Sequence, residues 1–596
     1  MSLTPDVESL TAAGYLSRLD AAFAGTIARL GGERRADVLL AAACASRQVG
    51  AGHVCLEMRR LVAQRTLVGD AGEPIPAPPW PRLEDWRRAL RSSALVSSVA
   101  DGTTAAATPR PLVLDGADRL YLHRYWRHQE VLAEALRARL GAADDSIDED
   151  LLQRGLARLF ATDSGSGAID LPRLAAETAV RHRFCVISGG PGTGKTTTVV
   201  KILALLAEQA ERRGSALRAE LLAPTGKAAM RLAEAIRAAK RDLACRPEIR
   251  DGIPEATRTI HRCLGAIGPT GTRFRHGPEA PLHADLVLVD EASMVDLALM
   301  ARLAAALPAH ARLVLLGDRH QLASVEAGSV LADICAAERS PVVFLTRSHR
   351  YAPESGIAAL ADAVQRGDVD GALAVLESSA HPDVARIDPG SSGPAEALVS
   401  EALAGYRPSL EEDDAAARLD AFARFRILCA HRRGPHGVET VNQLVEDALA
   451  EAGAIDLRGP TYVGRPLLVT RNDYALQLFN GDVGIIAPDP EDPSRRRAVF
   501  RSAEGALRRL SPARLPPHET VFAMSIHKSQ GSEFDAVAVL LAEPESPLLS
   551  RELLYTAVTR ARRRVTLYAS RDAIAAAVRR PVERSSGLRD ALASDA

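Results

Sequence analysis

A glycine-rich segment in the first half of the chain has the residue types of a phosphate-binding loop. It reads GGPGTGKT from Gly189 to Thr196 and fits the pattern GxxxxGK[ST]. The glycines allow backbone amides to surround phosphate oxygens, the ammonium of Lys195 can reach the β- and γ-phosphates, and the hydroxyl of Thr196 can bind Mg²⁺. The positions expected to contact the nucleotide are Gly189, Gly190, Pro191, Gly192, Thr193, Gly194, Lys195, Thr196 and Thr197. The segment therefore predicts ATP and Mg²⁺ as cofactors.

The residues on either side predict the strand and the helix that such a loop needs. The apolar run FCVI comes directly before Ser188, and TTTVVKILALLAE follows Lys195 with helical spacing. A glycine-rich loop that matched the pattern by chance would lack this context, so the context favours a true nucleotide site.

Two further apolar runs end in polar residues suited to hydrolysis. LVLVDEAS places Asp290 and Glu291 at the end of a predicted strand, where Asp290 can join Thr196 in holding Mg²⁺ and Glu291 can polarise the attacking water. Acidic pairs are usually solvated surface, but here four apolar residues lead directly into the pair. In LVLLGDRHQL, the amide of Gln321 can sense the γ-phosphate. Arg350 and Arg560 are candidates to neutralise charge in the transition state, although most arginines of this chain are expected at the surface.

Strands that alternate with helical patterns must position these residues. The first set of apolar runs is FCVI, LLA, LVLV, LVLL and VVFL, and a second set is RILCA, AVAVLL and VTLY. Such alternation predicts parallel sheets flanked by helices, and therefore an α/β fold with two cores. Domain boundaries are expected at 1–145, 146–345 and 346–596: a helical N-terminal domain, a first core and a second core. A turn-rich stretch within the second core, about residues 462–515, predicts a small β-barrel insert.

Composition excludes several other classes. The 596 residues are 47% hydrophobic and 25% charged, as in ordinary globular proteins. No stretch is long and apolar enough to span a membrane, and the N-terminus is acidic where a signal peptide is basic, so we expect a cytoplasmic protein without a membrane partner. Seven cysteines with no CxxC pair argue against zinc or an iron–sulfur cluster.

The charge balance limits how a nucleic acid could be bound. The chain has 74 basic and 75 acidic residues, so a nucleic-acid site must be a local groove. Only five of the basic residues are lysines, and Lys195, Lys227 and Lys528 lie in the segments discussed here. Because arginine has replaced lysine almost everywhere, these three are candidates for places that need a compact ammonium group.

The ordered segments GGPGTGKT, APTGKAAMRL, TIHRCLG, VDEASM, GDRHQL, TRSHRY, SIHKSQGSEFD and YTAVTRAR resemble those of the superfamily 1 DNA helicases, and most closely the RecD branch. GHVCLEM, LVLDGADRLYLHRYW and LCAHRRGPHGVETVNQL also resemble RecD segments. The resemblance implies two RecA-like P-loop cores and ATP-driven 5′ to 3′ movement along one strand of a duplex DNA end. It further implies RecB-like and RecC-like partner subunits, a RecC-docking N-terminal domain, and a role in exodeoxyribonuclease V during recombinational repair.

The same resemblance assigns roles to individual residues. It places Gly531 and Glu533 near the ribose, in addition to the nucleotide contacts above. The implied single-strand contacts are Pro224, Thr225, Lys227, His261, His527, Lys528 and Ser529. Small hydroxyl residues of this kind bond phosphate oxygens without reading sequence, as a motor requires.

Three features of the sequence limit what the resemblance implies. Pro172 stands where many relatives carry an adenine-reading glutamine, so base selectivity is open. Residues 265–282 fall where relatives extend a hairpin that splits the duplex, and a plain surface loop is an equal alternative. None of the five lysines has Asp or Glu two residues before it, the spacing typical of RecB-type nucleases, so we expect cutting of DNA to belong to a partner chain.

Other functions stay open at this level. A stand-alone RecD-like helicase or an RNA helicase of the same superfamily group would share these segments. A non-motor ATP switch would bind nucleotide without DNA-stimulated turnover, which fits poorly with the presence of both Glu291 and Arg560.

Overall fold

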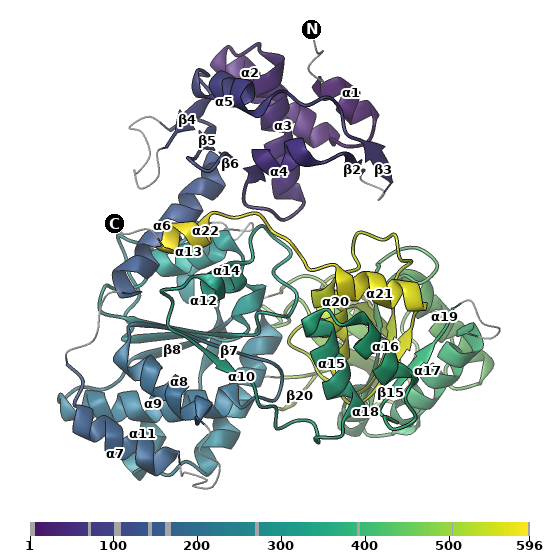
Figure 1. Ribbon diagram of the computed structural model, residues 1–596. Helices are drawn as coiled ribbons and strands as arrows, with labels where there is room; N and C mark the ends of the chain where they lie inside the picture. Colours follow the sequence, from purple (N-terminus) through teal and green to yellow (C-terminus); the bar gives the residue numbers. More distant parts are fainter. Residues whose placement is uncertain are drawn as a thin grey trace.

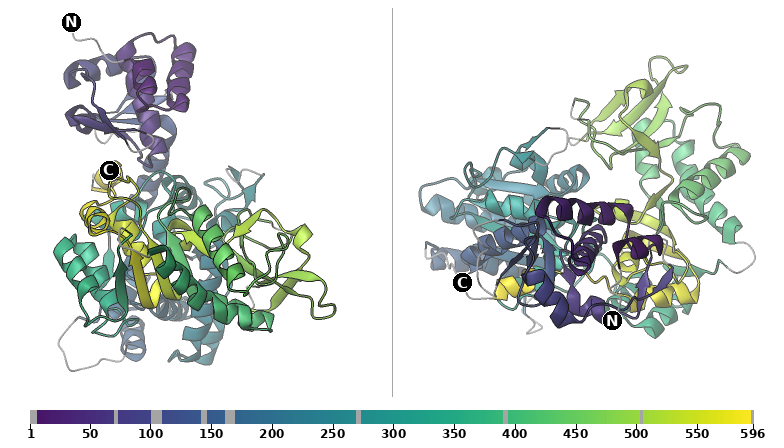
Figure 2. Two further views of the ribbon diagram at one scale, coloured as in Figure 1. Left: turned by 90° about the vertical axis from the view of Figure 1, so that its right-hand side faces the viewer. Right: turned by 90° about the horizontal axis from the view of Figure 1, so that it is seen from above.

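Two parallel β-sheets, one in each half of the chain, organise the structure (Figure 1). The computed structural model describes residues 6–69, 73–99, 109–140, 146–160, 169–268, 273–389, 394–473, 475–502 and 505–593. An N-terminal region stands at one end of the molecule, and an antiparallel insert forms a lobe beside the second sheet (Figure 2). The α/β class with two parallel-sheet cores is therefore confirmed.

The first sheet has six parallel strands. In spatial order they are β14 (Val342–Leu345), β7 (Phe184–Gly189), β13 (Arg312–Gly317), β12 (Leu286–Val289), β8 (Ala219–Ala223) and β9 (Thr257–Thr259). Successive side chains of β7 point to opposite faces: Val186 packs with Met300 on one face, and Ile187 with Leu203 on the other. Strands buried on both faces carry unbroken apolar runs, which is why the sequence revealed them.

Helices cover both faces of this sheet. They are α6 (His123–Leu140), α7 (Glu149–Leu159), α8 (Leu171–Arg181), α9 (Lys195–Arg212), α10 (Gly226–Arg241), α11 (Pro247–Gly252), α12 (Ile260–Leu264), α13 (Leu297–Ala305) and α14 (Val330–Ala336). Although α6 precedes the expected boundary at 145/146, its Leu132 and Leu136 pack with Leu303 of α13. The expected domain boundaries stay predictions.

The second sheet has five parallel strands. They are β15 (Val384–Ile387), β24 (Ala561–Tyr568), β23 (Phe534–Leu540), β16 (Phe425–Cys429) and β22 (Ala523–Ser525). The helices around it are α15 (Gly356–Arg366), α16 (Val369–Glu377), α17 (Pro394–Glu411), α18 (Ala415–Phe422), α19 (Val438–Glu451), α20 (Arg551–Val558) and α21 (Arg571–Arg579). They bury this sheet in its own hydrophobic core.

The insert is an antiparallel sheet, and the predicted barrel is not confirmed. Its strand order is β20 (Leu507–Leu510), β19 (Arg496–Arg501), β18 (Val483–Pro488), β17 (Pro466–Val469) and β21 (His518–Thr520). A barrel closes only when its two edge strands pair. Among the described residues, the edge strands β20 and β21 pair with their inner neighbours and not with each other.

The N-terminal region is helical, as expected, but also contains a sheet. Its helices are α1 (Val7–Ala12), α2 (Arg18–Gly31), α3 (Ala36–Gly50), α4 (Met58–Ala63) and α5 (Leu83–Arg91). The sheet order is β1 (Leu56–Glu57), β6 (Arg119–Leu122), β5 (Leu112–Leu114) and β4 (Val96–Ser98), and β2 (Thr66–Val68) pairs separately with β3 (Pro74–Pro76). These strands have two to four residues, too few to show an alternating pattern.

The C-terminal segment leaves the second core and returns to the first (Figure 1). Its last helix, α22 (Leu588–Ala593), packs against α6 and α14, and Leu588 lies in the hydrophobic core of the first sheet. On the way, Val54 donates its backbone N–H to Ser585, and Ser585 donates to Nδ1 of His53. The segment thereby ties the N-terminal region to both cores. In the described residues no helix is long and apolar enough to cross a membrane.

Candidate functional site: a nucleotide site and a strand-binding surface

The predicted phosphate loop joins the end of β7 to the start of α9. Gly194 has a φ of 81°, in the left-handed region that favours glycine, directly before the helix. A Cβ on Gly189 would lie 2.9 Å from the carbonyl oxygen of Leu345, so the loop can pass here only as glycine. Thr193 is buried and donates to Gly190, whereas Thr196 in the first turn of α9 is half-buried and Thr197 is exposed. The order strand, glycine loop, helix is the one that phosphate binding requires.

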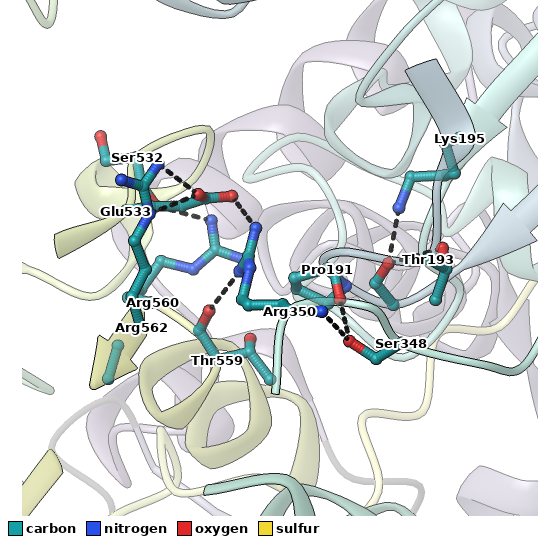
Figure 3. Close-up of polar contacts among 12 residues, drawn as sticks. Pro191, Thr193, Lys195, Ser348, Arg350, Ser532, Glu533, Thr559, Arg560 and Arg562 are labelled. Carbon is teal, nitrogen blue, oxygen red and sulfur yellow. Dashed lines mark hydrogen bonds and ion pairs between the residues drawn. The ribbon is translucent and has the colours of Figure 1, made fainter. Parts of the chain in front are cut away.

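The side chain of Lys195 is hydrogen-bonded to the backbone of its own loop. The Nζ atom of Lys195 donates to the carbonyl oxygens of Gly189, at 2.5 Å, and Gly190, at 2.9 Å. Figure 3 shows the Lys195 side chain turned toward the loop. These acceptors are neutral, and among the described residues no carboxylate lies at hydrogen-bond distance from the Lys195 ammonium. The loop has no room for a Cβ at Gly189, and only weak acceptors hold the Lys195 ammonium. Both features fit the binding of a triphosphate.

The acidic pair lies at the end of β12, in the same sheet as the loop. The Asp290 carboxylate accepts the backbone N–H of Glu291 at 2.9 Å, and Glu291 has a φ of 51°, which is strained for a non-glycine residue. Burial raises the pKa of Asp290 to about 6, and the charge of Glu291 adds to this while Lys195 opposes it. A divalent cation would relieve two carboxylates placed so closely, so the pair fits Mg²⁺. The described residues contain no cluster of three His, Cys, Asp or Glu side chains that could hold a metal ion.

Gln321 lies in the segment after β13, the strand between β7 and β12. It is buried, and its Nε2 atom donates to Asp318 at 3.2 Å. The strand order thus brings the phosphate loop, the acidic pair and Gln321 to one edge of the first sheet.

Arg350 lies directly against the phosphate loop. A Cβ on Gly192, whose φ is 76°, would stand 2.4 Å from the Cβ of Arg350. The neighbouring Ser348 donates to the carbonyl of Pro191 at 3.0 Å, and the backbone N–H of His349 donates to Gly192 at 2.8 Å (Figure 3). Sequence reasoning selected Arg350 but missed these two neighbours, because neither residue type marks a nucleotide site.

Arg560 is held inside the second core. It is 2% exposed, and it donates to the carbonyl oxygens of Thr556, at 3.1 Å, and Ser532, at 3.0 Å. In this conformation its guanidinium group is hydrogen-bonded to the backbone of its own core (Figure 3). Its predicted role in neutralising transition-state charge therefore requires a change in position when nucleotide binds.

Glu533 connects the two arginine-bearing segments. It pairs with Arg350 and also with Arg562, at 3.0 Å (Figure 3). Burial opposes its ionisation, but Arg350, Arg231 and Arg562 outweigh this and hold the pKa of Glu533 at about 2. Gly531, with a φ of 66°, permits the turn that precedes it. Of the two predicted ribose contacts, Glu533 therefore lies beside Arg350, near the phosphate loop, and Gly531 lies near Ala228 of α10.

The predicted single-strand contacts fall on both cores. Pro224, Thr225 and Lys227 lie at the end of β8 and the start of α10, where the Thr225 hydroxyl caps the helix by accepting from Ala228 at 3.2 Å. His261 lies in α12 beside Phe274, with ring centroids 5.9 Å apart. His527, Lys528 and Ser529 form a short 3₁₀ turn after β22. Ser529 is buried, and its hydroxyl donates to Ile526 at 2.7 Å, so it supports the turn rather than facing outward.

The insert places carboxylates beside both lysines of this set. Glu519 of β21 pairs with Lys528 and also with Arg432, at 3.4 Å. Asp482 of the loop before β18 is the acidic group that raises the pKa of Lys227, against burial and two neighbouring arginines. In the same loop Phe479 packs on Gly226, 3.3 Å from where a Cβ would stand. Sequence reasoning missed these acids, because they lie in a segment with no recognisable motif.

Two other predicted features can be placed. Within 265–282, β10 (Ala266–Ile267) pairs antiparallel with β11 (Arg273–Phe274), and Ile267 is exposed, so the segment is a short hairpin; residues 269–272 lie outside the described chain. Pro172 is in the first turn of α8. Its side chain has no hydrogen-bonding group, so it cannot read a base as glutamine does.

The fold and the site define a P-loop nucleotide hydrolase built from two parallel-sheet cores. Three family models match the chain: an AAA domain at residues 173–381, a UvrD-like helicase C-terminal domain at residues 520–568, and the N-terminal domain of RecBCD enzyme subunit RecD at residues 12–121.

Comparison with curated proteins gives the family. The chain is 42% identical to RecBCD enzyme subunit RecD of Mycobacterium tuberculosis, over 99% of this chain and 97% of that one. It is 31% identical to the RecD subunit of Haemophilus influenzae, over 85% and 84% of the two chains. It is 32% identical to the ATP-dependent RecD2 DNA helicase of Deinococcus radiodurans, over 75% of this chain and 55% of that one. The chain belongs to the RecD family of RecBCD enzyme subunits.

Proposed function

We propose that this chain is the ATP-hydrolysing DNA helicase subunit of a RecBCD-type enzyme, and that it moves 5′ to 3′ along single-stranded DNA from duplex ends. The observation that carries the proposal is the boundary between the cores. The phosphate loop and the acidic pair belong to the first core, while Glu533, Arg560 and Arg562 of the second core lie close by. Hydrolysis at such a boundary can change how the two cores sit on a strand that both of them hold.

Each group has a defined task in this proposal. The phosphate loop and Lys195 bind the triphosphate, Thr196 and Asp290 hold Mg²⁺, and Glu291 polarises the attacking water. Bound ATP with Mg²⁺ supplies the phosphoryl group whose transfer to water drives the movement. Gln321 senses the γ-phosphate, and Arg350 and Arg560 neutralise the charge that develops on it.

The strand-binding surface consists of Thr225 and Lys227 on the first core and His527 and Lys528 on the second. Contacts from such residues go to phosphates, so binding is expected to be independent of sequence and to weaken as salt rises. The hairpin of 265–282 carries the exposed Ile267, which is suited to wedging between bases at a fork.

The test of activity and polarity is strand displacement. We expect ATP-dependent unwinding of duplexes that carry a 5′ single-stranded tail and none of duplexes with a 3′ tail. Unwinding only from the 3′ tail contradicts the polarity, and stronger ATPase stimulation by RNA than by DNA favours an RNA helicase. An ATPase that no strand stimulates contradicts the motor function itself.

The N-terminal region is proposed to dock on a RecC-like subunit of the heterotrimer that a RecB-like subunit completes. Leu19 and Leu30 of α2 are 75% and 83% exposed and stand eleven residues apart, about three helical turns, on one face. Exposed large apolar side chains on one face favour a protein contact. Changing both to Glu is expected to abolish co-purification with the partner while DNA-stimulated ATPase remains. Retained co-purification would contradict this docking face.

A further inference from the structure

The segment that carries Gln321 is attached to the second core by three hydrogen bonds. They run from the Leu322 backbone N–H to the Thr556 hydroxyl at 2.9 Å, from the Gln530 amide to the Leu322 carbonyl at 2.7 Å, and from the Tyr555 hydroxyl to the Asp318 carboxylate at 2.9 Å. Tyr555 and Thr556 belong to α20, and Gln530 directly follows the strand-binding turn of His527–Ser529. The γ-phosphate sensor is therefore joined physically to the core that carries this turn.

Asp318 fixes which way the Gln321 amide points. The carboxylate is 2% exposed, and one of its oxygens, Oδ2, accepts from both the Tyr555 hydroxyl and the Gln321 amide. Because a carboxylate only accepts, the amide nitrogen of Gln321 must face it and the amide oxygen must point elsewhere. Within the described chain, that oxygen is buried and has no hydrogen-bond partner. A buried acceptor without a hydrogen bond destabilises the fold unless a ligand or a water donates to it. We therefore expect the Gln321 amide oxygen to accept from a group that arrives with the nucleotide.

The Tyr555 hydroxyl also touches the phosphate loop. A Cβ on Gly190 would lie 3.0 Å from the hydroxyl oxygen, so the phenol closes on the loop at the residue that follows β7. Burial raises the pKa of Tyr555 well above its usual value, and the charge of Asp318 adds to this. This shift of the pKa favours the neutral phenol, which can donate a hydrogen bond.

We propose that Tyr555 is a positioning residue that couples the second core to hydrolysis: its hydroxyl, moving with α20, sets the direction of the Asp318 carboxylate and thereby the direction of the Gln321 amide at the γ-phosphate. The proposal rests on the proposed function, since it assigns the path by which a bound strand accelerates ATP turnover. Loss of the hydroxyl leaves Asp318 with Gln321 and leaves the two hydrogen bonds of Leu322 to the second core, but it removes the direct bond between the Asp318 carboxylate and α20.

The test is Tyr555→Phe in the full chain, which keeps the ring and removes only the hydroxyl. ATPase is measured across ATP concentrations with and without saturating single-stranded DNA. We expect the kcat of the DNA-stimulated reaction to fall about 10-fold, with the KM for ATP and the Kd for the strand within about twofold of wild type, because the interaction acts on the transition state rather than on binding. A merely structural role would lower the thermal stability and change KM as well.

The chain offers a matched control in the same core. Tyr568 of β24 also donates its hydroxyl to a carboxylate, that of Glu401, at 2.8 Å, and no contact joins it to the phosphate loop in the described residues. Tyr568→Phe removes the same kind of bond and is expected to leave strand-stimulated turnover unchanged. An equal loss in both variants would show a general effect of weakening the second core and would overturn the proposal.

A double-mutant cycle identifies the path. If Tyr555 acts through Asp318, adding Tyr555→Phe to Asp318→Asn slows turnover no further than Asp318→Asn alone. Independent, additive losses overturn the proposed path. A stimulated wild type with an equally stimulated Tyr555→Phe overturns this inference alone, whereas a wild type that no strand stimulates overturns the proposed function and the inference with it.

Discussion

The phosphate loop and the strand-binding surface hold their positive charges in opposite ways. Lys195 donates to two carbonyls of its own loop, so its contacts are local and neutral. Lys528 is paired with Glu519, and Lys227 faces Asp482, and both acids come from the insert. The acceptors of Lys195 lie within the same eight residues of sequence, whereas the acids near Lys227 and Lys528 come from the insert, a separate segment of the chain.

The difference predicts different behaviour on binding. A triphosphate replaces weak carbonyl contacts of Lys195 without breaking an ion pair. In the proposed function a DNA strand has to compete with these two carboxylates for the lysines, so we expect strand binding to depend on where the insert lies. The two regions should therefore respond differently to substitution: the loop through turnover, and the surface through affinity.

The largest effect is expected at Lys195. Lys195→Ala should reduce ATP turnover to the background rate, at least about 10³-fold, while thermal unfolding stays near wild type, because the compact charge on the β- and γ-phosphates is lost and no ion pair of the apo protein is broken. Lys195→Arg should fail almost as badly, since a planar guanidinium is too broad for a loop of carbonyls and amides. Near-normal steady-state turnover in the arginine variant would contradict the assignment.

The next largest effect is expected at Arg560. Arg560→Ala should slow hydrolysis about 10³-fold while nucleotide binding changes little, if the residue moves from its backbone contacts to the γ-phosphate when the cores close. Steady-state ATPase with saturating DNA and an equilibrium nucleotide titration measure the two quantities. Arg563→Ala, at an exposed arginine of β24, the strand that begins directly after Arg560, is the matched control. A modest loss equal to that of the control would return Arg560 to a structural role.

The features that the sequence predicts are the ones that are local in the chain, as the phosphate loop is. The phosphate loop, five of the six strands of the first sheet and the acidic pair were recognisable because each lies within a few consecutive residues of fixed type, and buried parallel strands are continuously apolar. The strands β9, β15 and β22 escaped notice because they are three to four residues long and none of them is a continuous apolar run. Tyr555, Asp482 and Glu519 escaped because their importance arises from contacts between segments far apart in the chain, which spacing does not encode.

A smaller effect, on affinity, is expected from the Lys528 and Glu519 pair. Lys528→Ala should weaken single-strand binding about equally for all sequences, by about fivefold, and reduce the slope of log K against log salt by roughly one. Glu519→Gln should change affinity in the opposite direction, because it removes the carboxylate that competes with the phosphate. Arg458→Ala controls for loss of an exposed paired charge, since Arg458 pairs with Asp456 only two residues away. Equal, weakened binding in both Lys528→Ala and Glu519→Gln would contradict the competition between acid and strand.

The smallest effect, about threefold over the whole range from pH 7 to 9, is expected from the protonation of Lys227. Burial lowers the pKa of Lys227 to about 7, with Arg231 and Arg426 adding to the effect and Asp482 opposing it. Above pH 7 the free protein therefore loses this charge, whereas a bound phosphate favours the charged form. Binding then takes up a proton, so affinity should fall as pH rises from 7 to 9.

The nearby histidines do not contribute to this dependence of affinity on pH. Burial lowers the pKa of both His261 and His527, so both are already neutral above pH 7. Titrations of one oligonucleotide at constant salt between pH 6 and 9 measure the slope. Lys227→Met should flatten it, and Lys528→Ala should weaken binding yet keep the slope. If affinity still falls with pH in Lys227→Met, the proton taken up on binding belongs to another group. Asp482 and the insert would then not control how the first core binds the strand.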